Sequence, residues 1–333
     1  MQMILTKQRT PHRYPIEKSP FFGLSSKRRL GELLGIDLSS IRDVEKSGLC
    51  SQYRSFIDKK TRRFITEPIG DLGVVHKNVL KYLVRIAPPD YIHSATKSRS
   101  YKTNAVAHCN GKSVVKIDIK KFFQSVKFER IHRFFLKTLT CSPDVATILA
   151  KVCTVRTDDF GCHLPTGSCI SPILSFLANK DLFDAIDDLS KKQRCTFTLY
   201  VDDMTISGEG ANSALLSQVA TEIFKRGYSY HKTNVSKSSY SLVTGLVVGS
   251  GRIYLPHIRA QKIRQLREAL YISTGAKELL LSSLVGRLSE AEQIDPRYKP
   301  IRLKVVKDHQ TEWRRIIRRR TLLSLRARGL GGI

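Results

Sequence analysis

The sequence predicts a mixed α+β fold in roughly the first 250 residues and a basic, helical region after them. Residues 52–69 and 196–207 each have the pattern of a β-hairpin around a charged turn. The run VVKIDI at 114–119 is typical of a central strand. From Pro256 onward, apolar residues recur at helical spacing. Strands and helices therefore alternate first, and helices follow.

Caps, breakers and apolar spacing predict the remaining elements. Ser25 or Ser26 and Asp37 are suitable helix N-caps. Pro88 and Pro89 should end the helix before them, because proline lacks the backbone donor that a helix interior needs. We expect helices at 26–34, 37–46, 72–86, 128–139, 172–189 and 212–226, a strand at 242–248, and C-terminal helices at 263–270, 279–288, 301–306 and 313–325.

These elements suggest three domains. We expect an N-terminal helical extension at 1–50, a main domain at 51–250 and a basic helical domain at 251–333. The last boundary lies near the turn Gly249-Ser250-Gly251, where the composition changes.

The charge of the chain points to its partners. Of 333 residues, 41% are hydrophobic, which argues against a disordered chain, and 57 Lys and Arg stand against 29 Asp and Glu, a net charge of +28. From Pro256 onward there are 18 Lys and Arg against 7 Asp and Glu. An excess of this size predicts a polyanionic partner; the alternative is a basic surface that is merely solvated.

We expect neither membrane insertion nor secretion. The longest stretch without Asp, Glu, Lys or Arg, residues 160–179, contains His163 and two prolines, and the N-terminus lacks the apolar core of a signal peptide. The seven cysteines form no C-x-x-C pair, which predicts reduced thiols in a cytoplasmic protein. Cys153, Cys162, His163 and Cys169 form a conceivable zinc site, but their spacing fits no common ligand pattern.

Two acidic positions stand out in this basic chain. Asp118 lies inside an apolar strand, and Asp202 and Asp203 lie together at a hairpin turn. An unpaired carboxylate in a buried strand is costly, and adjacent carboxylates repel each other. Divalent cations remove both costs, and Mg²⁺ prefers such oxygen ligands while leaving positions for substrate phosphates. The alternative for Asp202 and Asp203 is an ordinary polar turn.

Three motifs occur in a fixed order around these carboxylates. Phe122 and Phe123 follow the strand of Asp118, residues 164–172 read LPTGSCISP, and residues 200–203 read YVDD between two β-like runs. Together they resemble the first aspartate motif, the LPxG-x-x-x-SP motif and the YxDD box of the reverse transcriptases.

Further motifs resemble the bacterial retron reverse transcriptases in particular. Residues 104–108 (NAVAH) match an N-A-x-x-H motif and residues 243–245 match a V-T-G motif of those enzymes. The segment LLLSSLVGRLSEAEQIDPRY is similar to the start of their thumb. The resemblance covers about residues 53–309.

The resemblance implies a right-hand polymerase fold, with fingers, a palm built on an antiparallel sheet with helices, and a helical thumb. It implies RNA-directed DNA synthesis by two-metal phosphoryl transfer, with Asp118, Asp202 and Asp203 binding two Mg²⁺ ions. The template would be a structured non-coding RNA. DNA synthesis would start from the 2′-hydroxyl of a guanosine in that RNA and give a branched RNA–DNA product. A role in antiphage defence with a separate effector protein is also implied.

The resemblance assigns several residues to the incoming dNTP. Lys60 and Arg63 would hold the triphosphate; the alternative is a solvated charge run. Phe123 would pack under the sugar and exclude a 2′-hydroxyl, unless both Phe122 and Phe123 belong to the core.

The LPxG loop and a lysine complete the expected nucleotide site. Pro165 and Gly167 would shape the loop beneath the nascent base pair, and Thr166 departs from the usual Gln, so a contact of that amide is missing or replaced by water. Lys232 or Lys237 is the candidate general acid for the pyrophosphate leaving group, with Lys232 the closer match.

RNA contacts are expected from the retron motifs and from the basic helices. The residues are Asn104, His108, Val243, Thr244, Gly245, Arg259, Arg264 and Arg267. His108 is either a template contact or a hydrogen-bonded core residue. Tyr254, Tyr271 and Trp313 either stack on bases or belong to the core.

Two other functions fit the same motifs less well. One is a group II intron-type or diversity-generating reverse transcriptase, although the first normally carries a longer C-terminal region. The other is a catalytically silent RNA-binding protein on the same fold, which only Thr166 supports.

Overall fold

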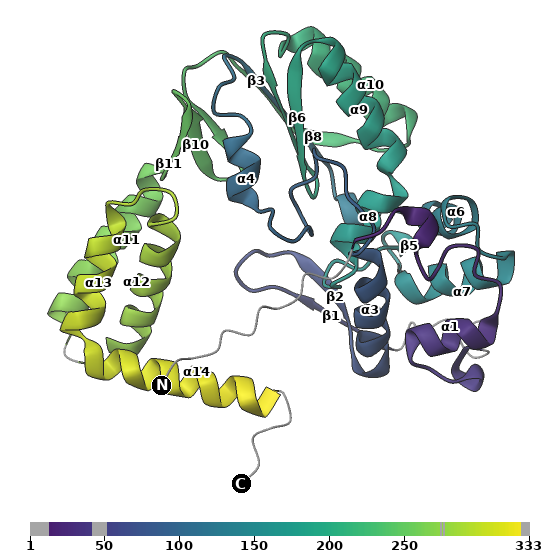
Figure 1. The fold of residues 1–333 in the computed structure, drawn as a ribbon, viewed down its shortest axis with the longest axis horizontal. Coiled ribbons are helices and arrows are strands. Elements are labelled where there is room, and N and C mark those ends of the chain that lie inside the picture. The colour runs from purple at the N-terminus through teal and green to yellow at the C-terminus, as the bar shows by residue number, and fades with distance from the viewer. Residues whose placement is uncertain (1–12, 42–51, 274, 276, 328–333) are drawn as a thin grey trace. The chain divides into compact units, whose positions relative to one another are not determined.

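The computed structural model describes residues 13–41, 52–273, 275 and 277–327 (Figure 1). The chain divides into two compact units, Met1–Ser238 and Ser239–Ile333, and each is described by itself. The three domains expected from the sequence stay a prediction.

The first unit combines a four-stranded sheet with helices and two short hairpins. Its described helices are η1 (Ile16–Lys18), α1 (Lys27–Leu34), α3 (Gly70–Leu83), α4 (Tyr101–Val106), α5 (Phe122–Ser125), α6 (Phe128–Arg133), the π-helical turn η3 (Phe134–Thr138), α7 (Pro143–Cys153), α8 (Ser171–Ala178), α9 (Lys180–Lys192) and α10 (Ser213–Lys225). Its described strands are β1 (Tyr53–Ile57), β2 (Phe64–Pro68), β3 (Val114–Ile119), β4 (Val155–Thr157), β5 (Gly161–His163), β6 (Cys195–Tyr200), β7 (Asp203–Gly208) and β8 (Tyr230–Ser236).

The four-stranded sheet is antiparallel, in the order β6-β7-β3-β8, so β3 is an interior strand as predicted. Side chains alternate between its two faces. Val115, Ile117 and Ile119 are fully buried in the main hydrophobic core, together with residues of α9 and α10, which run along one side of the sheet (Figure 1). Asp118 therefore points to the opposite face.

Several predicted elements are confirmed. β1 pairs with β2, and β6 pairs with β7, as antiparallel hairpins. α1 begins after Ser26, whose hydroxyl accepts a hydrogen bond from the Arg29 N–H at 3.2 Å. α3 and α10 lie within about three residues of their expected limits. The helix expected at 128–139 is present as α6, which continues into the π-helical turn η3.

The single helix expected at 172–189 is wrong, because the chain breaks at Asn179 between α8 and α9. Asn179 has ψ near 20° and is fully buried. Its side chain accepts a hydrogen bond from the Tyr228 hydroxyl at 2.7 Å and donates one to the Ser175 carbonyl at 2.8 Å. A buried amide with these partners competes with the helical backbone, a contact that apolar periodicity does not reveal.

The helix expected at 37–46 is only partly described. Asp37 Oδ1 accepts a hydrogen bond from the Ser40 N–H at 2.7 Å, as the predicted N-cap should, and residues 38–41 are helical. The remainder of this prediction lies outside the described residues.

The second unit begins with a small antiparallel sheet. Its described strands are β9 (Ser241–Val243), β10 (Leu246–Gly249) and β11 (Arg252–Tyr254), in the order β11-β10-β9. The single strand expected at 242–248 is wrong, because Thr244 and Gly245, with φ of 43° and 78°, form a tight turn between β9 and β10. Periodicity of apolar residues on both sides of a two-residue turn looks like one strand.

Four helices follow in the second unit, as expected: α11 (His257–Ile272), α12 (Lys277–Ala291), α13 (Tyr298–Asp308) and α14 (Gln310–Ala327). They enclose a second hydrophobic core, whose fully or nearly fully buried members include Ile263, Leu281, Leu284 and Leu288. None of the helices that the structure describes is both long and apolar enough to cross a membrane.

Candidate active site

The three aspartates of the motifs meet at one edge of the four-stranded sheet. Asp118 near the end of β3 and Asp203 at the start of β7 are paired in register on neighbouring strands. Asp202 occupies the β6–β7 turn, where its carbonyl accepts a hydrogen bond from the Ile119 N–H at 3.2 Å. Residues that lie far apart in the sequence are thus brought together by strand pairing.

The turn that presents Asp202 has an unusual backbone. Val201 has φ 63°, a left-handed conformation that β-branched residues rarely adopt. Its N–H donates a hydrogen bond to the Ser94 hydroxyl at 3.0 Å. Such a conformation costs on the order of 1–3 kcal/mol and persists only where the surrounding structure fixes it. The turn therefore holds Asp202 and Asp203 in a preorganised arrangement.

Burial raises the pKa of all three carboxyl groups. For Asp118, Asp202 and Asp203 the largest cause is the loss of contact with water. Mutual repulsion adds to it, because Asp203 raises the pKa of Asp118, Asp118 that of Asp202, and Asp202 that of Asp203. The ionised forms are therefore disfavoured, and a nearby cation stabilises them.

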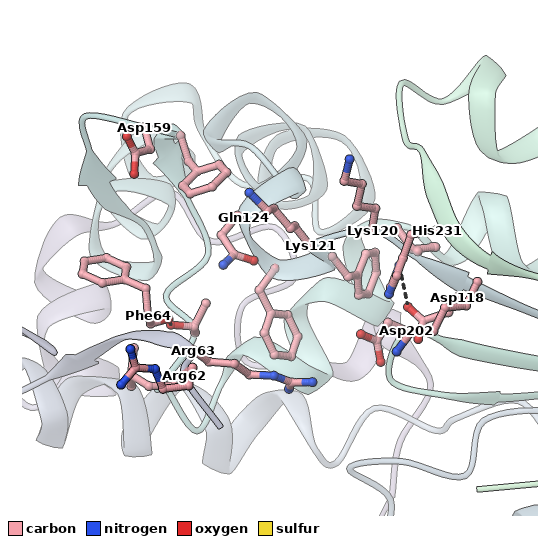
Figure 2. A pocket seen from close by; sticks show the side chains of 17 residues that line it. Arg62, Arg63, Phe64, Asp118, Lys120, Lys121, Gln124, Asp159, Asp202 and His231 are labelled. Atoms are coloured by element: carbon pink, nitrogen blue, oxygen red, sulfur yellow. Dashed lines mark hydrogen bonds and ion pairs between the residues drawn. The ribbon is translucent and has the colours of Figure 1, made fainter. Parts of the chain in front are cut away.

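A β-bulge brings His231 to this site. The register between β3 and β8 shifts at Asp118, so that Lys232 pairs with Asp118 and Tyr230 with Ile119, which leaves His231 unpaired between them. The Nδ1 atom of His231 lies 3.5 Å from Asp118 Oδ1, as the dashed line in Figure 2 shows. Bulges commonly re-aim a side chain next to an active site.

The donor set fits divalent cations chemically. Asp118 Oδ1 is buried and forms no hydrogen bond with any residue that the structure describes. Carboxylate oxygens are the ligands that Mg²⁺ prefers. Over the described ranges, however, no three His, Cys, Asp or Glu side chains are gathered closely enough to hold a metal ion, and this includes the four residues considered as a zinc site. The three aspartates therefore supply suitable donors without forming a finished ligand cage.

A cavity of about 670 Å³ opens beside Asp118 and Asp202. Figure 2 shows these carboxylates on one side of it and Arg62, Arg63 and Phe64 on another, with Lys120, Lys121 and Gln124 between them. Arg63 lowers the pKa of Asp202, although burial outweighs this effect. The cavity thus joins an acidic edge to a basic wall, which suits a phosphorylated ligand bound with cations.

The two phenylalanines that follow β3 both line the cavity, but they differ in burial. Phe123 is half-buried and lines the cavity. Phe122 is 2% exposed and packs against Phe183 and Tyr228, with ring centroids 6.1 and 5.9 Å away. Because Phe123 is the more exposed of the two, it is the better placed to contact a ligand.

Of the other residues expected to bind dNTP, some line the cavity and others do not. Arg63, Thr166 and Lys232 line it. Lys60, on the β1–β2 turn, and Pro165, Gly167 and Lys237 are absent from its lining as far as the chain is described. Their roles remain predictions, and the geometry favours Lys232 over Lys237 as the lysine next to the reacting groups.

Asn104 and His108 lie inside the protein. His108 is 1% exposed, with Nδ1 2.7 Å from the Ser207 hydroxyl and Nε2 2.7 Å from the Thr198 hydroxyl. Burial lowers the pKa of His108 to about 3. Asn104 is fully buried, and within the described ranges its amide forms no hydrogen bond. The geometry corresponds to the core alternative for His108; a role of the motif in RNA binding stays a prediction.

In the second unit, two predicted RNA-binding features adjoin each other. A Cβ atom on Gly245 would lie 2.6 Å from Arg259 Nη2, so the guanidinium lies against the Thr244–Gly245 turn. Arg259 Nη1 is 2.7 Å from Glu290 Oε1 on α12. Val243 is fully buried, whereas Arg264 and Arg267 are exposed on α11.

The three aromatic residues expected either to stack or to pack differ in exposure. Tyr271 is 91% exposed, Trp313 packs against the second core, and Tyr254 lies half-buried in contact with Arg252 and Tyr240.

Sequence analysis missed several residues of the cavity. Arg62, Lys120, Lys121, Phe160 and His231 all line it. Lys121 Nζ lies 4.6 Å from the centre of the Phe160 ring. The basic residues next to Asp118 and Arg63 were visible as charge runs, but the bulge that aims His231 leaves no sequence signal.

Comparisons with known proteins place this chain in a family. Residues 44–268 match the family described as Reverse transcriptase (RNA-dependent DNA polymerase). This match covers more than half of the chain.

Curated relatives agree with this match. The Retron Se72 reverse transcriptase of Salmonella heidelberg is 26% identical over 75% of this chain and 68% of its own length. The Retron Mx162 reverse transcriptase of Myxococcus xanthus is 29% identical over 74% of this chain. The Retron Ec86 reverse transcriptase of Escherichia coli is 24% identical over 77% of each chain. The chain spans only 59% of the length of the Myxococcus relative. These similarities confirm the resemblance to bacterial retron reverse transcriptases.

Proposed function

The chain belongs to the reverse transcriptase family, the RNA-directed DNA polymerases, and on this premise we propose that it is a retron enzyme that copies a structured non-coding RNA into DNA. Synthesis starts from the 2′-hydroxyl of a guanosine in that RNA and yields a branched RNA–DNA molecule. The expected enzyme class is confirmed by the family; the template, the priming group and the product belong to the proposal.

One observation carries the proposal. Three carboxylates with raised pKa values stand at the edge of a sheet, beside a cavity whose other wall is basic. A polymerase site needs both features, because it must bind cations and hold a triphosphate at the same place.

We assign the chemistry as follows. Asp118, Asp202 and Asp203 would hold two Mg²⁺ ions, which would supply charge stabilisation for phosphoryl transfer. Arg63 holds the triphosphate by charge-assisted hydrogen bonds from the opposite wall. Lys232, the register partner of Asp118, gives a proton to the pyrophosphate leaving group.

Phe123 supplies the selection of the sugar. Its ring lines the cavity, and a bulky side chain beneath the sugar leaves no room for a 2′-hydroxyl. Phe122 supports it from the core, with the two ring centroids 6.2 Å apart.

The polymerase subdomains follow from these assignments. We propose that the four-stranded sheet with α9 and α10 is the palm, that the β1–β2 hairpin belongs to the fingers, and that α11–α14 form the thumb. Arg264 and Arg267 on α11 contact RNA phosphates, so RNA binding should weaken with salt. A separate effector protein and a role in antiphage defence complete the proposal.

The experiment is to express the full chain with its flanking genomic DNA and to analyse the nucleic acid that copurifies. It is run on a denaturing gel with and without RNase, DNase and debranching enzyme, beside the Asp202→Asn/Asp203→Asn variant. We expect a discrete DNA linked to RNA, shortened by debranching and absent from the variant.

Two results would contradict the retron assignment in different ways. An active enzyme that extends a primed RNA template but yields no branched product is a reverse transcriptase of another type. RNA in both preparations, with no synthesis on any primed template, would point to a silent RNA-binding protein.

A further inference from the structure

The β1–β2 hairpin is joined to the loop before α8 by a reciprocal pair of threonines. Thr166 Oγ1 accepts a hydrogen bond from the Thr66 N–H at 2.9 Å, and Thr66 Oγ1 accepts one from the Thr166 N–H at 3.1 Å. Thr166 Oγ1 also donates to the Phe64 carbonyl at 3.1 Å. Thr66 is fully buried and shields its two bonds with Thr166 from water, whereas the bond to the Phe64 carbonyl is exposed.

The neighbouring glycine allows this approach. The Gly167 N–H donates to the Thr66 carbonyl at 2.8 Å. A Cβ atom on Gly167 would lie 2.8 Å from Ile65 Cγ2 and 2.9 Å from Glu67 Cβ, which is closer than real Cβ contacts come. The loop and β2 therefore lie backbone against backbone.

The loop is itself anchored to the body of the first unit. The Ser168 hydroxyl lies 2.6 Å from His76 Nδ1, and His76 Nε2 lies 2.9 Å from the Val152 carbonyl. The Ser171 hydroxyl donates to the Pro165 carbonyl at 2.6 Å. Thr166 is thus held on a fixed base, and its bonds transmit that position to the hairpin.

The far end of the hairpin carries the basic wall of the cavity. Asp58 Oδ1 accepts hydrogen bonds from the Thr61 N–H at 2.6 Å and from the Thr61 hydroxyl at 2.7 Å. The Arg62 N–H donates to the Asp58 carbonyl, and the Asp58 N–H to the Arg63 carbonyl, at 2.8 and 2.9 Å. Because these bonds fix the turn relative to β2, the direction in which Arg62 and Arg63 point depends on the position of β2.

We propose that Thr66 and Thr166 are positioning residues that fix the β1–β2 hairpin so that Arg63 meets the triphosphate of the incoming nucleotide. This inference rests on the proposed function, because it presumes that the cavity binds a dNTP. It also explains Thr166 in place of the usual Gln. The threonine hydroxyl sits on Cβ, where it reaches the Thr66 N–H and the Phe64 carbonyl together, whereas the polar atoms of Gln lie two bonds further out.

The test measures DNA synthesis by the purified full chain on a primed RNA template with Mg²⁺, as a function of dNTP concentration. Thr166→Val keeps the shape and removes the hydroxyl. We expect the KM for dNTP to rise about three- to tenfold, the effect of losing one or two hydrogen bonds, while kcat changes by less than about twofold. Thr166→Ser keeps the hydroxyl and should retain the wild-type KM.

Two further variants separate positioning from other roles. Arg63→Ala should raise the KM by itself, and Thr166→Val should add nothing when Arg63 is already Ala, because the threonine acts through that arginine. Thr166→Gln should raise the KM if the pair positions the hairpin. A direct contact of residue 166 with the nucleotide predicts the opposite, a lower KM.

Amide hydrogen exchange provides a readout that does not need activity. Thr166→Val should speed the exchange of β2 amides, while β6 and β7 keep their wild-type rates. Three results would overturn the inference. They are an unchanged rate of amide exchange in β2 of Thr166→Val, additive effects of Thr166→Val and Arg63→Ala on the KM for dNTP, and a fall in kcat of Thr166→Ser as large as its rise in KM. A wild type that makes no DNA at all overturns the proposed function instead, and the exchange rates still decide whether the pair fixes the hairpin.

Discussion

The two hairpins beside the cavity look alike in sequence and differ in chemistry. Each has acidic residues in or next to its turn, Asp58 in the first and Asp202 with Asp203 in the second. Each also contains a non-glycine residue with positive φ, Arg62 at 58° and Val201 at 63°. A charged turn between two β-like runs is therefore not enough to identify a catalytic carboxylate.

The environments of the carboxylates make the difference. Asp58 accepts hydrogen bonds from the turn itself, chiefly from Thr61, and these bonds lower its pKa. Asp202 and Asp203 are half-buried next to other carboxylates, and partial loss of contact with water, with repulsion between the carboxylates, raises their pKa values. The first hairpin uses its carboxylate to fix a turn, whereas a bound cation would stabilise the ionised carboxylates of the second. Carboxylates left unsatisfied at a sheet edge indicate function better than an acidic turn does.

The largest effect is expected on DNA synthesis, when the carboxylates of the β6–β7 turn are substituted. Asp202→Asn with Asp203→Asn should reduce DNA synthesis about a thousandfold or more, because the variant loses cation ligands. RNA binding, measured by electrophoretic mobility shift, should stay within about twofold, since phosphate contacts from basic residues carry it. Equal losses of synthesis and RNA binding would mean that the aspartates support the fold rather than the reaction.

A second prediction uses the two phenylalanines. Phe123→Ala should raise rNTP incorporation relative to dNTP by about tenfold or more, because it removes the clash with a 2′-hydroxyl. The matched control is Phe122→Leu, which should lower the free energy of unfolding by about 1–2 kcal/mol and change this selectivity far less than Phe123→Ala does, because Phe122 is almost fully buried. Unchanged selectivity in Phe123→Ala would remove the assigned role.

A smaller effect is expected at the first turn. Asp58→Ala removes the acceptor that fixes the turn, so the KM for dNTP should rise about two- to fivefold while kcat is kept. Asp58→Asn keeps a carbonyl oxygen and should be milder. A loss of kcat like that of Asp203→Asn would show that the two turns are not as different as their environments indicate.

The smallest effect concerns stability without metal. A raised pKa in the folded state means that ionisation opposes folding, so this contribution to stability is fully present below the unfolded pKa of 3.8 and is lost as the pH rises through the folded-state pKa. At pH 7 without divalent cations, Asp203→Asn should therefore raise Tm by about 2–4 °C. The gain should disappear at about pH 3, below the unfolded pKa. Calorimetry in EDTA at both pH values checks this, and a gain that is independent of pH would contradict it.

The sequence correctly predicted elements that depend on residues close together in the chain. The two hairpins and β3 were predicted because charged turns and β-branched runs have a recognisable spacing. Asp118, Asp202 and Asp203 stood out as acidic residues in a basic chain, and strand pairing brings them together. The order of the motifs also identified the family correctly.

Contacts between distant segments decided what the sequence could not show. Asn179 breaks a helix because Tyr228 bonds to its side chain, and a register shift between β3 and β8 aims His231 at Asp118. The sequence shows Thr166 in place of the usual Gln but does not show its partner, because Thr66 lies 100 positions away. Such partners follow from tertiary packing, which has no local periodicity.

The most direct test of the central claim is the effect of Mg²⁺ on thermal stability, because it examines the carboxylates without relying on activity. The wild type and Asp58→Asn should each show a Tm that rises with Mg²⁺ concentration, as expected for a ligand that binds the folded state. Asp202→Asn/Asp203→Asn should show no such rise. The same rise in all three proteins, or a loss of it only in Asp58→Asn, would contradict the assignment of the β6–β7 turn as the cation site.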